Sequence, residues 1–342
     1  MQAMPTTVRS FAKINLGLHI GALRPDGFHE LRTVYQTIAL HDVIRVRVAR
    51  GEGIEIRCRD PRVPTDSTNT CYRIVERAMA SLGVGFKVTI EIEKKLPVQG
   101  GLGGASANAV ATLLAFEQAA KKEIPAAEKL SLAAEVGSDL PLFLIGGTIL
   151  GIGRGEDVYP LSDLPATACV VATPDIGVST PKAFADWDLL QGSAGGTPAW
   201  TGEGARPHTN RSKLTPLSPS DRMNEFSRRV SAWLSGVSGV PGERSRGRAE
   251  TPLLDLVRTG IENDFERVVF PQHPELGEVK RVLEREGAFY ASLSGSGSAV
   301  YGLFQGRAAA ARAAARLKAE GIPAVATITL PRRQYWQRIF DC

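Results

Sequence analysis

The segment VQGGLGGASANAV, residues 98–110, is rich in glycine. Its four glycines fall within six positions, at Gly100, Gly101, Gly103 and Gly104. Glycines let a loop turn its backbone N–H groups toward a ligand, and the small residues that follow have the spacing of a helix, whose N-terminus adds partial positive charge. This combination is typical of a phosphate site. A strand-to-helix turn without a ligand is the other interpretation, and the glycines alone do not decide between the two.

Two well-known phosphate loops are excluded. A Walker loop requires Lys and then Ser or Thr after its last glycine, whereas Gly104 is followed by Ala105 and Ser106. A dinucleotide fingerprint requires Gly or Ala where Ser106 stands and an acidic residue later at a strand end, but the region around Glu117 and Glu123 has a helical pattern. A phosphate-binding loop here must therefore belong to another nucleotide-binding fold.

A lysine, an asparagine and an aspartate elsewhere in the chain could also do chemistry. Residues 8–20 alternate between polar and apolar as in a strand with one polar face, so Lys13 and Asn15 point the same way. Such a pair fits a polar cleft or a solvated strand face, and the pairing favours the cleft. Asp139 lies in a Gly-Ser-Asp turn, where a helix cap or a turn residue is the simplest interpretation.

The composition is that of a soluble protein with material for two domains: 342 residues, 43% hydrophobic and 23% charged. The four cysteines lie far apart without metal-ligand spacing, which indicates reduced thiols, a cytoplasmic protein and no zinc site. The most apolar run, 140–153, is too short and glycine-rich to span a bilayer, and no signal peptide is expected. The net charge of +5 suits phosphorylated small molecules as well as nucleic acid.

Hydrophobic periodicity predicts an α+β chain that positions these residues. The predicted strands are 8–20, 29–39, 43–50, 53–58, 86–94, 142–153, 167–173, 289–293, 298–304 and 322–328. The predicted helices are 68–82, with Thr68 or Asn69 as its cap, 105–120, 126–136, one from Pro274, and 307–319. The renewed alternation after residue 163 divides the chain into two domains, 1–162 and 163–342.

Residues 191–250 break this pattern with glycine, proline, serine and a basic string, and only 222–234 has helical spacing. This composition predicts a solvated, partly disordered insertion without a catalytic role. A nucleic-acid-binding arm is the alternative, but the segment lacks the interleaved aromatic residues that stack on bases.

Three segments, in this order and spacing, resemble the GHMP kinases, the superfamily of galactokinase, homoserine kinase, mevalonate kinase and phosphomevalonate kinase. They are FAKINL at 11–16, PVQGGLGGAS at 97–106 and LSGSGS at 293–298. Two more segments, RPDGFHEL at 24–31 and GSDLP at 137–141, resemble the members whose substrate is a methylerythritol carried on a cytidine diphosphate. The resemblance covers about residues 8–189 and 252–330, so only the insertion is foreign to it.

The resemblance implies a two-domain GHMP kinase fold, with an N-terminal domain like domain 2 of ribosomal protein S5, a ferredoxin-like C-terminal domain, and the active site between them. It implies transfer of the γ-phosphoryl group of ATP to the 2-hydroxyl of this substrate, in the non-mevalonate route to isoprenoids, with Mg²⁺ as cofactor. The expected partner is this small molecule, with neither nucleic acid nor membrane. Neither the resemblance nor the composition indicates an oligomeric state or the metal ligands.

The resemblance also assigns roles to single residues. Asp139 would accept the proton of the substrate hydroxyl, and Lys13 would orient the pair and stabilise developing negative charge. The residues expected to bind ATP are Asn69, Pro97, Gly100, Gly101, Leu102, Gly103, Gly104, Ala105 and Ser106. Lys94 and Lys95 either add positive potential to this loop or are exposed lysines at a strand end, and Asn69 is either an adenine neighbour or a helix cap.

For the substrate, the resemblance points to Asn15, Phe28, His29, Thr180 and Phe184. His29 would hydrogen-bond the cytosine edge, the two phenylalanines would stack on its ring, and Thr180 would shape that wall. Read alone, both phenylalanines would be core residues. The turn at 294–297 is either a simple hairpin or a segment that closes the site.

Two other functions remain as alternatives. One is another GHMP kinase, such as a mevalonate- or homoserine-type enzyme, although a substrate without a base needs no aromatic pair. The other is a basic RNA-binding protein that uses the S5-like fold without catalysis. The presence of Lys13 and Asp139 beside an intact glycine loop disfavours this second alternative.

Overall fold

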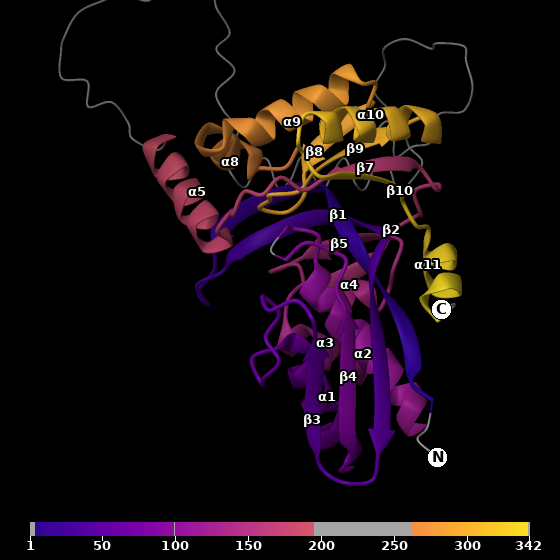
Figure 1. The fold of residues 1–342 in the computed structure, drawn as a ribbon. Helices are drawn as coiled ribbons and strands as arrows, with labels where there is room; N and C mark the ends of the chain where they lie inside the picture. The colour runs from indigo at the N-terminus through magenta and orange to yellow at the C-terminus, as the bar shows by residue number, and fades with distance from the viewer. Residues whose placement is uncertain (1–3, 99, 195–261, 341–342) are drawn as a thin grey trace, which may run out of the picture.

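The computed structural model describes residues 4–98, 100–194 and 262–340, which form two β-sheets with helices packed on them (Figure 1). The strands are β1 (Thr6–Leu23), β2 (His29–Ala49), β3 (Gly53–Cys58), β4 (Lys87–Glu93), β5 (Thr148–Ile152), β6 (Asp157–Pro160), β7 (Ala168–Ala172), β8 (Tyr290–Leu293), β9 (Val300–Phe304) and β10 (Ala324–Ile328). The helices are α1 (Thr70–Leu82), α2 (Gly104–Ala120), α3 (Ala126–Val136), α4 (Leu140–Phe143), α5 (Thr180–Ala194), α8 (Glu266–Gln272), α9 (Pro274–Arg285), α10 (Arg307–Ala319) and α11 (Arg332–Ile339).

The N-terminal sheet is built on β2, which pairs with β1, β4 and β5. Its order is β3-β4-β2-β5-β6, with β1 beside β2, and β3 and β4 are the parallel pair. Helix α2 packs on β1 and β2 and is buried around most of its circumference, which suits its run of alanine, valine and leucine. The glycine loop before α2 is therefore fixed to the centre of this sheet.

The C-terminal sheet has the order β10-β7-β9-β8, and all of its pairings are antiparallel. Helices α9 and α10 pack on this sheet (Figure 1). The strand order and the two helical crossings, one from β7 to β8 and one from β9 to β10, are those of a ferredoxin-like domain. The predicted α+β fold with a ferredoxin-like C-terminal domain is thus confirmed.

The hydrophobic core consists of one cluster in each domain and a third cluster between them. The third cluster joins Ile14 and Leu16 of β1 to Val171 of β7 and Tyr301 of β9. Because β1 packs on α2 as well as on the C-terminal sheet, almost all of its middle is buried. Lys13 and Asn15 of β1 consequently lie at the interface between the two domains.

Three predicted strands differ from the observed ones. The run predicted as one strand at 142–153 forms α4 and then a turn, and β5 begins only at Thr148. Pro141 favours the first turn of a helix, and Gly146 and Gly147 adopt positive φ, which ends the helix and delays the strand. The strands predicted at 29–39 and 43–50 are one strand, β2, whose interruption is a bulge opposite β1.

Most other predicted elements are confirmed with shifted ends, whereas α5, α8, β6 and α11 were not predicted. Asn69 is the cap of α1, since its Oδ1 accepts a hydrogen bond from Cys71 N at 2.8 Å. The predicted insertion at 191–250 lies outside the described residues apart from its first four, which end α5. The domain boundary near residue 163 stays a prediction. None of the described helices is long and apolar enough to cross a membrane.

Candidate active site

The glycine loop is held from two sides by backbone contacts. Lys13 N on β1 donates to Leu102 O at 3.0 Å, and Ala299 N donates to Gly100 O at 3.1 Å. Gly101 has a φ of +73°, and a Cβ at this position would lie only 2.1 Å from Ser294 O. Only glycine allows this close approach, so the loop touches the turn at 294–298 that precedes β9.

A cavity of about 440 Å³ lies beside the loop. Every residue that was predicted to bind ATP lines it, together with residues 62–64 and with Thr68, Thr70, Cys71, Ile92, Lys94, Val98 and Asn108. Asn69 lines this cavity while capping α1, so the two interpretations of Asn69 are compatible. Burial raises the pKa of the Cys71 thiol to about 12, which makes it an unreactive part of the wall.

A buried carboxylate that the sequence did not single out fixes the strand end before the loop. Asp42 of β2 accepts hydrogen bonds from Lys94 Nζ at 2.7 Å and from the backbone N atoms of Lys95 and Leu96 at 2.6 and 2.7 Å. It also accepts one from Asn108 Nδ2 of α2 at 3.0 Å. Lys94 is therefore not an exposed lysine at a strand end but one member of a buried ion pair at the cavity.

Lys13 contacts both Asn15 and Asp139 beside Gly103 of the glycine loop. Lys13 Nζ donates to Asn15 Oδ1 at 2.6 Å and lies 3.5 Å from Asp139 Oδ2. The Lys13 side chain is 4% exposed and that of Asp139 is 33% exposed, so the carboxylate is the member of the pair that solvent or a ligand can reach. Asn15 is oriented in turn, because its Nδ2 donates to Thr33 Oγ1 at 2.8 Å.

Asp139 is also held by a phenol. Tyr35 OH donates to Asp139 Oδ1 at 3.1 Å. Burial, and then the adjacent Asp139 carboxylate, raise the pKa of Tyr35 well above its ordinary value, so the phenol stays protonated and remains a donor. Asp139 precedes α4 but makes no side-chain capping bond to it. Its carboxylate therefore points to Lys13 and Tyr35 rather than to the helix end.

The turn at 294–298 covers this cluster. A Cβ at Gly295 would lie 3.6 Å from both Lys13 Nζ and Asn15 Oδ1. The turn is held by Asn263, whose Nδ2 donates to Leu293 O at 2.9 Å and to Gly295 O at 2.7 Å. Ser296 Oγ lies 2.7 Å from Thr180 Oγ1, which links the turn to the start of α5. This turn is more than a hairpin, since it touches both the glycine loop and the Lys13–Asn15 pair.

The residues predicted to bind the cytidine group lie where β2 and α5 meet. The rings of His29 and Phe184 are stacked, with centroids 5.1 Å apart and an interplanar angle of 5°. His29 Nε2 lies 3.3 Å from Asp188 Oδ1 on α5. Phe184 also packs edge-on against Phe265 at 5.0 Å, so it belongs both to the core and to this wall.

Phe28 differs from its neighbours because it is 52% exposed. The guanidinium of Arg154 lies 5.1 Å from its ring centroid. The structure thus brings His29 together with Phe184 and places Phe28 against Arg154. Their roles toward a substrate stay predictions.

Four polar residues at the site were missed by the sequence reasoning: Tyr35, Asp42, Asp188 and Asn263. Tyr35 and Asp42 lie within predicted strands, where alternation indicates a face but not a partner. Asp188 lies on a helix that was not predicted, and Asn263 follows the insertion. No local signal connects any of the four to Lys13, because their contacts span long sequence separations.

Comparison with known proteins identifies the family of this chain. Residues 69–147 match the GHMP kinases N terminal domain, and residues 250–323 match the GHMP kinases C terminal domain. The 4-diphosphocytidyl-2-C-methyl-D-erythritol kinase of Solibacter usitatus (strain Ellin6076) is 35% identical over 333 residues, which cover 97% of this chain and 92% of that protein. The enzyme of the same name from Gloeobacter violaceus (strain ATCC 29082 / PCC 7421) is 35% identical over 92% of this chain and 90% of that protein.

A solved structure is similar along almost the whole chain. The crystal structure of a 4-(cytidine 5'-diphospho)-2C-methyl-D-erythritol kinase superimposes with a TM-score of 0.67 at 28% identity, covering 94% of this chain and 98% of that one. This chain therefore belongs to the 4-diphosphocytidyl-2-C-methyl-D-erythritol kinase family of the GHMP kinases.

Proposed function

We propose that this protein transfers the γ-phosphoryl group of ATP to the 2-hydroxyl of 4-diphosphocytidyl-2-C-methyl-D-erythritol. Relatives that carry the name of this activity match this chain over nearly their whole length. The observation that carries the proposal is the placement of Asp139 between Lys13 and Tyr35, beside a glycine loop that borders a cavity. Phosphoryl transfer requires a positioned hydroxyl, a phosphate cradle and charge neutralisation, and these groups match that list.

Asp139 acts as the proton acceptor in this proposal. Its Oδ2 faces Lys13 and its Oδ1 accepts from Tyr35, so the carboxylate is oriented by two donors while a third of its surface stays open to a substrate hydroxyl. Lys13, almost fully buried, keeps its ammonium at the point where negative charge develops on the attacking oxygen. Asn15 holds that ammonium in place.

The glycine loop binds the ATP phosphates through its backbone N–H groups, and the N-terminus of α2 adds positive charge. Mg²⁺ accompanies ATP in this proposal. In the portion of the chain that the structure describes, no group of three or more His, Cys, Asp or Glu could hold a metal ion. A hard cation that keeps phosphate and water ligands fits such a site, with Ser106, which lines the cavity, as a protein oxygen. The ion would neutralise phosphate charge.

The cytidine group binds where His29, Phe184 and Phe28 lie, at the other end of the site. Phe184 offers a ring face that a cytosine could share, and Phe28 offers an exposed one. His29 Nε2 lies 3.3 Å from the exposed Asp188 carboxylate. To hydrogen-bond the cytosine edge, this nitrogen must give up that contact or share it with the base. Asn15 and Thr180 lie next to the bound substrate in this proposal.

A coupled ADP-release assay tests the proposed function. The purified protein is given ATP with the cytidyl methylerythritol substrate, with mevalonate or with homoserine, each at several concentrations. We expect substrate-dependent ADP release with the cytidyl substrate only. Equal or greater kcat/KM with mevalonate or homoserine would assign the chain to another activity, and ADP release that no alcohol stimulates would contradict a kinase of this class.

A further inference from the structure

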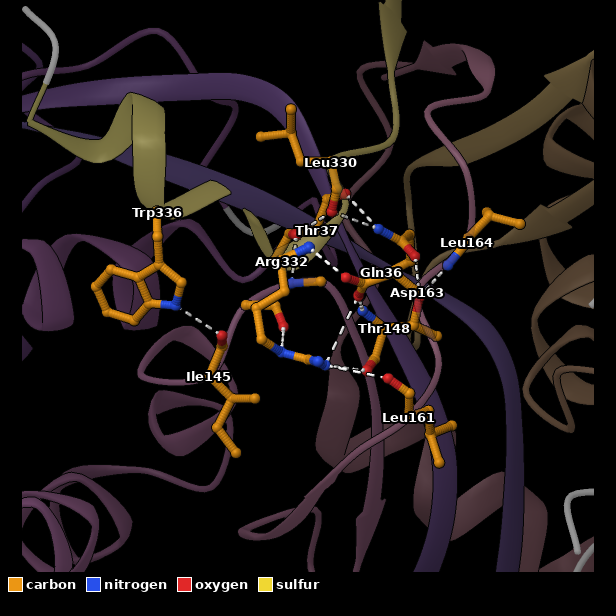
Figure 2. A network of polar contacts seen from close by, with 12 residues as sticks. Gln36, Thr37, Ile145, Thr148, Leu161, Asp163, Leu164, Leu330, Arg332 and Trp336 are labelled. Carbon is orange, nitrogen blue, oxygen red and sulfur yellow. Dashed lines mark hydrogen bonds and ion pairs between the residues drawn. The ribbon is translucent and has the colours of Figure 1, made fainter. Parts of the chain in front are cut away.

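Helix α11 at the C-terminus donates three side-chain hydrogen bonds to the turn that follows α4. Tyr335 OH donates to Phe143 O at 2.7 Å, Trp336 Nε1 donates to Ile145 O at 3.0 Å, and Arg332 Nε donates to Gly146 O at 3.1 Å. Figure 2 shows Trp336 and Arg332 reaching this turn from α11. These are carbonyls at the end of a helix, where the backbone lacks its own partners. The two segments are almost two hundred residues apart in the sequence.

The turn is shaped to receive α11. Gly146 and Gly147 have φ values of +69° and +79°. A Cβ at Gly146 would lie 2.3 Å from the Tyr335 ring, and one at Gly147 would lie 2.8 Å from Arg332 N. Side chains at either position are thus excluded both by the backbone conformation and by α11 itself.

The entrance to α11 is fixed to the strand that carries Tyr35. Leu330 O accepts from Gln36 Nε2 at 2.9 Å and from Thr37 Oγ1 at 3.0 Å (Figure 2). Arg332 Nη2 donates to Thr148 O at 3.1 Å and to Leu161 O at 3.2 Å, and its backbone N donates to Asp163 Oδ2 at 2.8 Å. The helix therefore bridges β2 and the turn after α4 by contacts on both sides.

Helix α4 is a single turn with Asp139 directly before it and Phe143 at its end. A Cβ at Gly103 of the glycine loop would lie 3.0 Å from Phe143 Cζ and 3.0 Å from Lys13 Cγ. Phe143 therefore packs against the loop beside Lys13, while its carbonyl is held by Tyr335. A shift of α4 along its axis would move Asp139 and Phe143 together.

We infer that α11 is a positioning element for phosphoryl transfer: by holding the carbonyls after α4, it sets the place of Asp139 relative to Lys13 and the glycine loop. Arg332, Tyr335 and Trp336 are positioning residues that touch no reacting group. The inference rests on the proposed function, since it assigns Asp139 to the reaction. Misplacement of a reacting group by about 1 Å is known to cost up to about 10²-fold in rate.

Two variants with a matched control test this inference. Arg332→Met removes the guanidinium contacts to the turn and to β5, and Tyr335→Phe removes only the hydroxyl that holds Phe143 O while keeping the ring against Gly146. Arg333→Met is the control, because Arg333 is the exposed neighbour on the same helix. For each variant kcat, the KM for ATP and amide hydrogen exchange are measured below the melting temperature.

We expect kcat to fall by about 10-fold or more in Arg332→Met and less in Tyr335→Phe, with the KM for ATP changed less than about twofold. Amide exchange should accelerate at residues 140–148 in both variants and nowhere in the control. A folded Arg332→Met protein with unchanged kcat would overturn the inference, as would a kcat loss shared by Arg333→Met or a loss without faster exchange at 140–148.

The exchange measurement needs no substrate, which separates this inference from the proposed function. A wild-type protein that phosphorylates no alcohol would refute the proposed function, whereas exchange at 140–148 would still decide whether α11 holds the Asp139 segment. Unchanged exchange there would overturn the inference even in a fully active enzyme.

Discussion

Replacing Asp139 with Asn separates the charge of this residue from its size and much of its hydrogen bonding. An amide oxygen can still accept from Tyr35 OH, which lies 3.1 Å from Oδ1. The atom facing Lys13 Nζ at 3.5 Å loses its negative charge and its basicity. Removal of a general base costs about 10²–10⁴-fold in rate. In a loose transition state the proton leaves the attacking hydroxyl late, so the base contributes little to the barrier. We therefore expect turnover to fall by about 10²-fold, the lower end of this range.

The fold should survive this change. Lys13 keeps its 2.6 Å hydrogen bond to Asn15, and the carboxylate that is lost was one third exposed. We expect the free energy of unfolding to fall by about 1.5–3 kcal/mol, the scale of one hydrogen bond to a charged group. Asp157→Asn, at an exposed carboxylate on β6, is the control for nonspecific effects.

The assay is steady-state ADP release with the cytidyl substrate, combined with thermal melts and with Lys13→Met alone and in the double variant. Because Lys13 and Asp139 act as one unit, the double variant should lose far less than the product of the two single losses. The affinity for ATP should change little in Asp139→Asn. A folded Asp139→Asn protein that keeps more than about a tenth of wild-type turnover would refute the proton-acceptor role.

Three further outcomes are expected. Phe184→Ala should weaken binding of cytidine diphosphate by about 1–3 kcal/mol and leave ATP binding unchanged, and equal weakening of both in calorimetry would make this residue purely structural. Gly101→Ala forces a Cβ onto Ser294 O, so it should lower the free energy of unfolding in urea by about 1–3 kcal/mol and raise the KM for ATP. Gly85→Ala, at a position with open space around it, should change neither quantity. Burial raises the pKa of four of the six tyrosines, which are Tyr35, Tyr290, Tyr301 and Tyr335. The unfolded chain releases these phenolic protons at about pH 10 while the folded chain keeps them, so the free energy of unfolding should fall as pH rises above 10. The absorbance at 295 nm, which reports tyrosine ionisation, should then rise at lower pH in urea than in buffer, and coincident curves would contradict this.

Local patterns in the sequence predicted much of the fold. Alternation in β1 correctly placed Lys13 and Asn15 on one face, because the period of a strand is fixed by its backbone. The spacing of apolar residues located α2, α3 and α10 within one or two residues. The glycine loop was singled out because clustered glycines before a helix let backbone N–H groups face an anion, although the glycines alone do not decide whether a ligand binds there.

The same reasoning failed where contacts at long sequence separation decide the structure. Residues 140–147, directly after Asp139, include no polar side chain, and such a run does not distinguish a buried strand from a buried helical turn. Helix α11 has the sequence RRQYWQRI, with too few apolar residues for a clear period, and it is ordered by its contacts with the turn after α4. The link between Tyr35 and Asp139 spans 104 positions, which no local pattern can reveal.

The central claim is that this protein phosphorylates the 2-hydroxyl of the cytidyl methylerythritol substrate, and the product itself tests it most directly. The carbon that bears this hydroxyl also bears the methyl group and has no hydrogen. Proton-coupled ³¹P spectroscopy of the reaction mixture should therefore show a new phosphomonoester signal without three-bond coupling to a carbinol proton, in amounts equal to the ADP formed. A monoester signal split by a neighbouring CH or CH₂ group, or ADP accompanied only by inorganic phosphate, would contradict the account.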